Sequence, residues 1–229
     1  MVERRIMGMP VRVHGADGDA AAVFEWLRWV DATFSTYRAD SEVCRLDRGE
    51  LALRDAHPLV REVLERCEAL REPTGGYFDA RAGGRLDPSG LVKGWAVDRA
   101  AVALQDLPGV SFCINAGGDL VVGAHPDLPD DGPGAIAWRI GIEDPRDRSR
   151  TAHVVSLTRG AVATSGTAAR GAHLYDPASG ELVGRAGSTT VHGPTLLWAD
   201  VWATALFVGD ETTRAAFASR APAYASIDQ

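Results

Sequence analysis

Two oxygen-bearing side chains stand four residues apart in an otherwise apolar stretch near the C-terminus. Asp200 and Thr204 would lie on one face of a helix, one turn apart. A carboxylate and a hydroxyl in this arrangement offer hard oxygen ligands to a cation such as Mg²⁺. The spacing fits equally well a structural role, in which Asp200 caps the helix or pairs with a neighbour and Thr204 bonds to its own backbone. In either case the apolar surroundings require a partner for the carboxylate.

A histidine is the second candidate for chemistry. His173 stands just before a turn signal in the stretch His173-Leu174-Tyr175-Asp176-Pro177, and an imidazole can accept a proton near neutral pH. It is either a general base or a strand-end histidine with an ordinary hydrogen bond. The remaining histidines have no comparable setting and form no HxxxH pair, so a histidine metal site is not expected.

Glycines are grouped with polar residues in four clusters. Glycine allows a backbone to approach a ligand and expose its N–H groups, although any one cluster also fits an ordinary turn. Asp, Asn, Lys, Ser and Thr inside the clusters favour a ligand site. GxxxxGK[ST] and GxGxxG are both absent, so we expect the ligand to be held by several loops. The clusters occupy residues 74–79, 87–94, 115–119 and 163–167.

Composition excludes several classes of protein. The chain has 229 residues, a net charge of −7 and 45% hydrophobic residues; without a Lys/Arg cluster it is a poor partner for nucleic acid or anionic membranes. No apolar run reaches the roughly 18 residues of a membrane span, and no secretory leader is visible, so we expect a cytoplasmic protein. Three cysteines without a CxxC pair disfavour a disulfide framework or a structural zinc site.

The elements that must position these residues follow from hydrophobic periodicity. No linker divides the chain, so one domain over residues 1–229 is expected. Helices early and late around a block of successive strands predict an α+β fold, with a mixed or antiparallel sheet core and flanking helices. Strands are expected at Met9–His14, Val110–Asn115, Leu120–Val122, Ala137–Glu143, His153–Leu157, Ala161–Ser165 and Ser188–His192, and helices at Gly18–Phe34, Pro58–Glu72, Lys93–Leu107, Leu197–Val208 and Thr212–Ser219.

Read in order, these clusters resemble the ApbE family, the FAD:protein FMN transferases. The resemblance covers nearly the whole chain, which makes a chance match of ordered motifs very improbable. The matching stretches are Phe34-Ser35-Thr36-Tyr37-Arg38, Gly75-Gly76-Tyr77-Phe78-Asp79, Asp87 through Asp98, Asn115-Ala116-Gly117-Gly118-Asp119, Trp138 through Pro145, Ala163-Thr164-Ser165-Gly166, His173 through Pro177, and Ala199-Asp200 through Leu206.

The resemblance implies a fold related to the T-fold and a Mg²⁺-dependent enzyme. Such an enzyme cleaves the pyrophosphate of FAD, attaches FMN to a threonine of an acceptor protein and releases AMP. Asp200, Thr204 and the main-chain carbonyl of Gly90 correspond to the metal ligands, and His173 corresponds to the base that deprotonates the acceptor threonine. The residues that correspond to the FAD contacts are Met7, Tyr37, Gly76, Tyr77, Phe78, Asp79, Asp87, Lys93 and Leu174.

Elementary chemistry agrees with these roles and leaves two alternatives. A net-anionic protein needs a cation to hold a pyrophosphate. The flexible, positively charged side chain of Lys93 can either stay bound to a phosphate as it moves or form an ion pair with Asp87. The same site with water as acceptor would make an FAD pyrophosphatase, and a site without turnover would make a non-catalytic FAD-binding protein. Only Ala80–Leu86 separates GGYFD from DPSG, where many family members carry a long insertion, so a more open site is expected.

Overall fold

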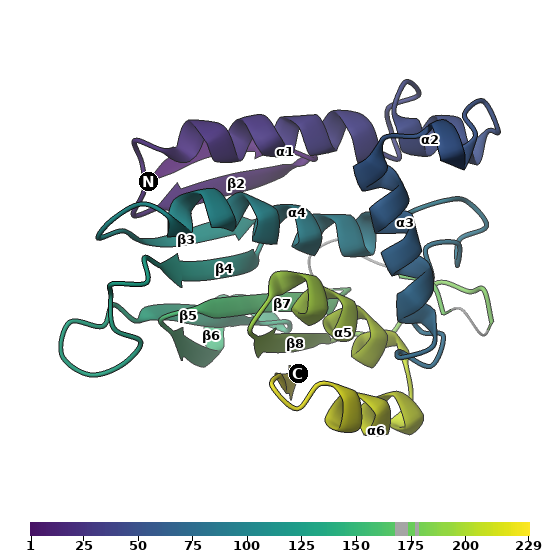
Figure 1. Ribbon diagram of the computed structural model, residues 1–229. Helices are drawn as coiled ribbons and strands as arrows, with labels where there is room; N and C mark the ends of the chain where they lie inside the picture. Colours follow the sequence, from purple (N-terminus) through teal and green to yellow (C-terminus); the bar gives the residue numbers. More distant parts are fainter. Residues whose placement is uncertain (168–173, 177–178) are drawn as a thin grey trace.

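A seven-stranded antiparallel sheet runs through the computed structural model, which describes residues 1–167, 174–176 and 179–229. Its strand order is β1-β2-β3-β4-β7-β8-β9, so most neighbours in the sheet are also neighbours in the chain (Figure 1). The strands are β1 Val2–Ile6, β2 Met9–His14, β3 Ser111–Ala116, β4 Asp119–Ala124, β7 Gly160–Gly166, β8 Ser188–Gly193 and β9 Ala225–Asp228.

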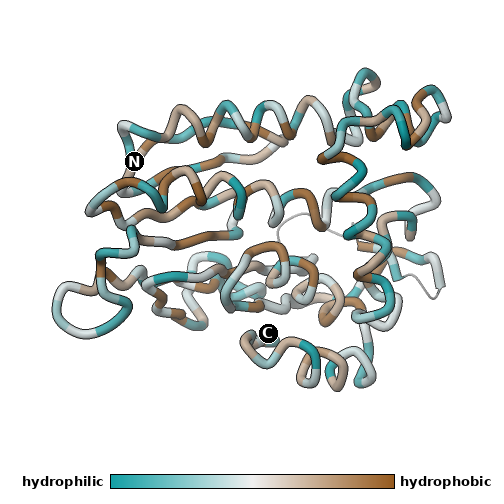
Figure 2. The backbone as a smooth tube through the Cα atoms, in the orientation of Figure 1, coloured by the Kyte–Doolittle hydropathy of each residue, from teal (hydrophilic) through white to brown (hydrophobic). Residues whose placement is uncertain are grey.

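One face of this sheet is covered by helices α1, α4 and α5 (Figure 1). On α1, Val23, Leu27 and Val30 recur at helical spacing and are fully buried, which is the apolar stripe that drives an amphipathic helix onto a sheet. Figure 2 shows this alternation of brown and teal along α1. The helices are α1 Ala20–Phe34, α2 Glu42–Asp47, α3 Pro58–Arg71, α4 Ser89–Gln105, α5 Leu196–Val208 and α6 Glu211–Arg220, with a short 3₁₀ turn at Leu53–Asp55.

The other face carries a separate two-stranded hairpin, β5 Trp138–Asp144 and β6 Asp147–Leu157. Side chains of β3 alternate between the two faces: Phe112 and Ile114 belong to the main core, whereas Cys113 belongs to a smaller apolar cluster beneath the hairpin. The hairpin therefore rests on its own small core. Within the described part of the chain, no helix combines the length and apolar character needed to cross a membrane.

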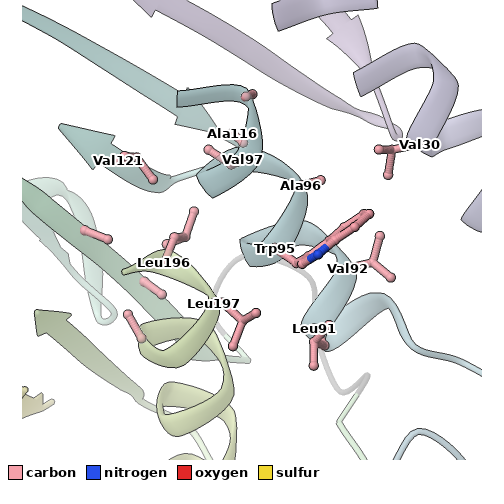
Figure 3. Close-up of a cluster of buried hydrophobic side chains, with 14 of the residues drawn as sticks. Val30, Leu91, Val92, Trp95, Ala96, Val97, Ala116, Val121, Leu196 and Leu197 are labelled. Atoms are coloured by element: carbon pink, nitrogen blue, oxygen red, sulfur yellow. The ribbon is translucent and has the colours of Figure 1, made fainter. Parts of the chain in front are cut away.

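Helices α4 and α5 touch backbone to backbone at Gly94. A Cβ added there would lie 2.8 Å from the carbonyl oxygen of Leu196 and 2.8 Å from the Cα of Leu197, closer than real Cβ contacts allow. Figure 3 shows side chains of Val97, Leu196 and Leu197 around this contact. Only glycine permits this spacing, and the site described below spans the two helices.

Asp98 of α4 caps the first turn of α5. Its two carboxylate oxygens accept hydrogen bonds from the backbone N–H groups of Leu196, at 2.9 Å, and Leu197, at 2.8 Å. These are donors that a helix cannot satisfy internally, and Thr195 at the N-cap position makes no side-chain cap. The carboxylate of α4 therefore fixes where α5 begins.

We expect Asp98→Ala to lower the free energy of unfolding by about 2 kcal/mol, because two buried N–H groups lose their acceptor. Urea unfolding followed by circular dichroism measures the change. Asp106→Ala, at the opposite and exposed end of α4, is the matched control and should change stability by less than about 0.5 kcal/mol. Equal effects of the two substitutions would contradict the capping role.

The stability difference between wild type and Asp98→Ala should also depend on pH. Burial raises the pKa of Asp98 above 3.8, although the two backbone N–H bonds act in the opposite direction. The folded protein therefore holds this proton more tightly than the unfolded chain, so the contribution of Asp98 is fully present below about pH 3.8 and declines as pH rises through the folded-state pKa. We therefore expect the difference in the free energy of unfolding between wild type and Asp98→Ala to become smaller from acid to neutral pH. A difference that grows over this range would contradict the raised pKa.

The expected α+β class is confirmed, and the boundaries differ in places. Helix α4 begins at Ser89 rather than Lys93, and β6 begins at Asp147 rather than His153. The other expected elements lie within two residues of their observed bounds. Strands β1 and β9 and helix α2 were not expected.

Candidate functional site

Lys93 lies between two buried carboxylates. Its Nζ forms an ion pair with Asp119 and a second, at 3.2 Å, with Oδ1 of Asp200. Asp119 is 4% exposed and Asp200 is 2% exposed, so these charges interact with little screening by water. The three groups come from α4, β4 and α5, and the packing of α4 on α5 at Gly94 brings them together.

Thr204 lies one turn along α5 from Asp200 and faces the sheet. Its Oγ1 is 2.9 Å from Oγ of Ser165 on β7. Ser165 follows Ala161 and Ala163 on the helix-facing side of β7, and these small residues let α5 lie close to the strand. Of the two structural alternatives for Asp200, the ion pair with a neighbour is confirmed, whereas the helix cap is wrong because Asp200 lies inside α5.

Asp119 is the site residue that sequence reasoning did not select. Its Oδ1 accepts a hydrogen bond from the backbone N–H of Thr164, at 2.9 Å, while the other oxygen faces Lys93. The carboxylate thus joins β4, β7 and α4. Asp119 does belong to the glycine-containing cluster Asn115-Ala116-Gly117-Gly118-Asp119. Its distance from Lys93 along the chain, however, gives no indication that the two side chains meet.

The loop between α3 and α4 packs against the start of α4. A Cβ on Gly90 would lie 3.2 Å from Cε2 of Phe78, so the buried Phe78 ring rests against the first turn of α4. Gly76 has a φ of +86°, and its N–H donates to the carbonyl of Arg71 at 2.7 Å, which ends α3. The cluster at residues 74–79 is therefore a turn that also holds an aromatic ring next to Gly90.

The acidic residues of this loop have partners of their own. Asp79 forms an ion pair with Arg71 at 3.2 Å. Asp87 accepts a hydrogen bond from the backbone N–H of Ser89 at 2.9 Å, at the start of α4. The expected alternative pairing of Lys93 with Asp87 is not the one found: Lys93 pairs with Asp119 and Asp200.

Tyr77 belongs to this loop, whereas Leu174 lies in the segment that precedes β8. Burial raises the pKa of the Tyr77 hydroxyl, and the charges of Asp210 and Asp176 raise it further. The carbonyl of Leu174 accepts a hydrogen bond from the N–H of Val183 at 2.8 Å. His173, the expected base, lies outside the described residues.

The β1–β2 turn and the loop that follows α1 lie at the same end of the sheet as the α3–α4 connection (Figure 1), and they carry Met7 and Tyr37 respectively. Met7 has a φ of +52° in the turn between β1 and β2 and packs partly against the main core. The Tyr37 side chain is 97% exposed. The structure brings Lys93 and Asp200 into contact, with Thr204 one turn along α5 from Asp200.

The donor set fits a hard divalent cation. Two buried carboxylates and one ammonium group together carry a formal charge of −1, and hydroxyl oxygens of Thr204 and Ser165 lie nearby. Oxygen donors of this kind suit Mg²⁺. Within the described residues no three His, Cys, Asp or Glu side chains group together as metal ligands. A cation here would therefore depend on hydroxyl and main-chain oxygens as well as Asp200.

Comparison with known families gives a match over almost the full chain. The model of the ApbE family matches residues 7–84 and 80–227. The FAD:protein FMN transferase of Vibrio cholerae serotype O1 is 32% identical over 136 residues, which is 55% of this chain. The aligned part spans only 39% of that relative's length.

Solved structures share the fold. The ApbE protein of Thermotoga maritima superposes with a TM-score of 0.82 at 21% identity, covering 99% of this chain and 93% of that one. The flavinyl transferase ApbE of Pseudomonas stutzeri, in its apo form, gives a TM-score of 0.77 at 24% identity, covering 98% of this chain and 89% of that one. At these identities the likeness establishes the α+β architecture.

Proposed function

Because this chain belongs to the ApbE family, we propose that it is a Mg²⁺-dependent FAD:protein FMN transferase. The observation that carries the proposal is the buried Lys93–Asp119–Asp200 cluster beside Thr204, at the place where the family resemblance puts the metal. The name of the Vibrio cholerae relative states the same activity. We also infer that residues 1–229 act as one domain, since the main core extends from Ile6 to Ala221.

The reaction exchanges the phosphoanhydride linkage of FAD for a phosphoester linkage to threonine. The hydroxyl oxygen of an acceptor threonine attacks the FMN phosphorus of FAD, the bond to the bridging oxygen breaks, and AMP leaves with that oxygen. The threonine proton passes to a base, the role proposed for His173. General-base assistance of this kind is typically worth about 10²–10⁴-fold.

Other residues of this chain would bind the metal ion, the phosphates and the flavin. Asp200, Thr204 and the carbonyl of Gly90 would hold Mg²⁺, whose positive charge would stabilise the charge that develops on the departing AMP. Lys93 binds a phosphate oxygen while Asp119 keeps its ammonium group in place. Met7, Tyr37, the loop Gly76–Asp79, Asp87 and Leu174 would contact FAD, and the open end of the sheet would leave Tyr37 available to cover the flavin ring.

The test follows both products of the reaction. Purified protein is incubated with FAD, MgCl₂ and a soluble protein extract; we expect AMP by chromatography and flavin fluorescence on a protein band in a denaturing gel. EDTA should abolish both signals. AMP and free FMN without a fluorescent band would identify an FAD pyrophosphatase, and FAD binding without either product would identify a non-catalytic binding protein. Both of these results would overturn the proposal.

A further inference from the structure

A pair of hydroxyl groups joins the main sheet to α5, one helical turn from Asp200. Oγ of Ser165 on β7 lies 2.9 Å from Oγ1 of Thr204, and Ser165 is buried. Ala161 and Ala163, on the same face of β7, are fully buried and carry no polar side-chain atom. Of these three small residues, the one that meets Thr204 is therefore the one with a hydroxyl group.

Ser165 determines which way the Thr204 hydroxyl faces. A threonine inside a helix has another choice, because its hydroxyl can bond a carbonyl oxygen three or four residues earlier in the same helix. In α5 these are the carbonyl oxygens of Val201 and Asp200. The bond to Ser165 instead crosses to β7, so Ser165 stabilises the rotamer in which the Thr204 hydroxyl faces the sheet.

The direction of this hydrogen bond matters for a cation. A hydroxyl oxygen has two lone pairs and one proton. When Thr204 donates its proton to Ser165, both lone pairs of Oγ1 stay available, whereas one of them is occupied when Thr204 accepts. A cation bound to Oγ1 would withdraw electron density and make the proton a better donor. Cation binding therefore favours Ser165 as the acceptor.

The same strand supports the other side of the candidate site. The backbone N–H of Thr164, the residue before Ser165, donates to Oδ1 of Asp119 at 2.9 Å, and Asp119 pairs with Lys93. Two successive residues of β7 thus contact two different groups of the site. A change confined to the Ser165 hydroxyl leaves the backbone contact of Thr164 in place.

We propose that Ser165 is a positioning residue for the cation: its Oγ accepts the Thr204 proton and keeps the lone pairs of Thr204 available to Mg²⁺. Ser165 itself does not bind the ion. The inference rests on the proposed function for the identity of the ion. Groups that bond a metal ligand rather than the metal are typically worth about 10–100-fold in metal affinity.

Binding of Mn²⁺ alone, followed by the EPR signal of the free ion, tests the inference without turnover, because Mn²⁺ takes the same kinds of oxygen ligand as Mg²⁺. Ser165→Ala removes only a hydroxyl group and should weaken Mn²⁺ binding by about tenfold. Thr190→Val is the matched control. It removes the 2.8 Å hydroxyl pair between the fully buried Thr190 and Thr164 of the same strand β7, and it should leave Mn²⁺ binding unchanged. Equal losses in the two variants would overturn the inference.

A double-mutant cycle shows whether Ser165 acts through Thr204. Thr204→Val keeps the shape of the side chain and removes its oxygen, so Ser165→Ala should cause no further loss of Mn²⁺ binding in the Thr204→Val background. A further tenfold loss there would mean that Ser165 contacts the ion directly, which overturns the positioning role. Unchanged binding in Ser165→Ala alone, or no Mn²⁺ binding to wild type, would overturn it as well.

AMP release from FAD by wild type, in the assay described above, is measured separately. Release combined with unchanged Mn²⁺ binding in Ser165→Ala refutes the role of Ser165 alone. Weakened Mn²⁺ binding in Ser165→Ala, without AMP release from wild type, refutes the enzymatic function alone.

Discussion

Replacing Asp200 by asparagine should reduce FMN transfer by on the order of 10³-fold, the scale of losing a charge-stabilising group from a water-excluded site. Asparagine keeps the shape of the side chain and removes its charge. Asp200 is 2% exposed and pairs with Lys93, so no solvent replaces what is lost. The measurement is the initial rate of AMP release and of protein-bound flavin at saturating FAD over a series of Mg²⁺ concentrations.

The control for this substitution is Asp127→Asn. Asp127 lies between β4 and β5, and its side chain is 84% exposed, so the same chemical change should leave the rate unaffected. Circular dichroism and a thermal melt confirm that both variants are folded. A loss of less than about threefold in Asp200→Asn would contradict the placement of the metal and the phosphate at this cluster.

Gly94→Val should have the largest effect on stability, a loss of about 3 kcal/mol, because a side chain cannot fit between α4 and the backbone of α5. The added Cβ would meet the carbonyl oxygen of Leu196 and the Cα of Leu197 at 2.8 Å. Backbone atoms do not rotate away as side chains do, so the two helices must separate. For a chain of this size the midpoint of thermal unfolding should fall by about 6–12 °C.

The matched control is Ala103→Val on the exposed side of α4. It adds the same side chain to the same helix and should cost only about 0.5 kcal/mol of helix propensity. Because α4 carries Lys93 and α5 carries Asp200, Gly94→Val should also lower the rate of AMP release at temperatures where the variant remains folded. A thermal midpoint equal to that of the control would contradict the close approach of the helices.

Much of the fold could be predicted from periodicity. The buried spacing of Val23, Leu27 and Val30 marks α1, and α5, apolar except for Asp200 and Thr204, stands out between Thr195 and Gly209. β1 was missed because Glu3, Arg4 and Arg5 give it no apolar alternation and only Ile6 is buried. The sequence predicts too late a start for α4 because Gly90 and Gly94 are poor helix formers. The first turn of the helix is stabilised by tertiary contacts, which local propensity does not reveal.

The candidate site could be predicted only where its residues share an element. Asp200 and Thr204 are one turn apart, and their common face follows from helix geometry. The pairing of Lys93 with Asp119 is set by how α4 crosses the sheet, which no local pattern encodes. Ser165 likewise meets Thr204 because β7 passes beneath α5, and the roles of His173, Met7 and Tyr37 remain predictions.

The charged outer strand β1 has a consequence for the protein at high concentration. It forms one border of the main sheet, and its residues Glu3, Arg4 and Arg5 are exposed. A second molecule approaching to extend the sheet would have to strip water from these charged side chains. This border therefore opposes the end-to-end stacking of sheets by which many strand-rich proteins form fibres.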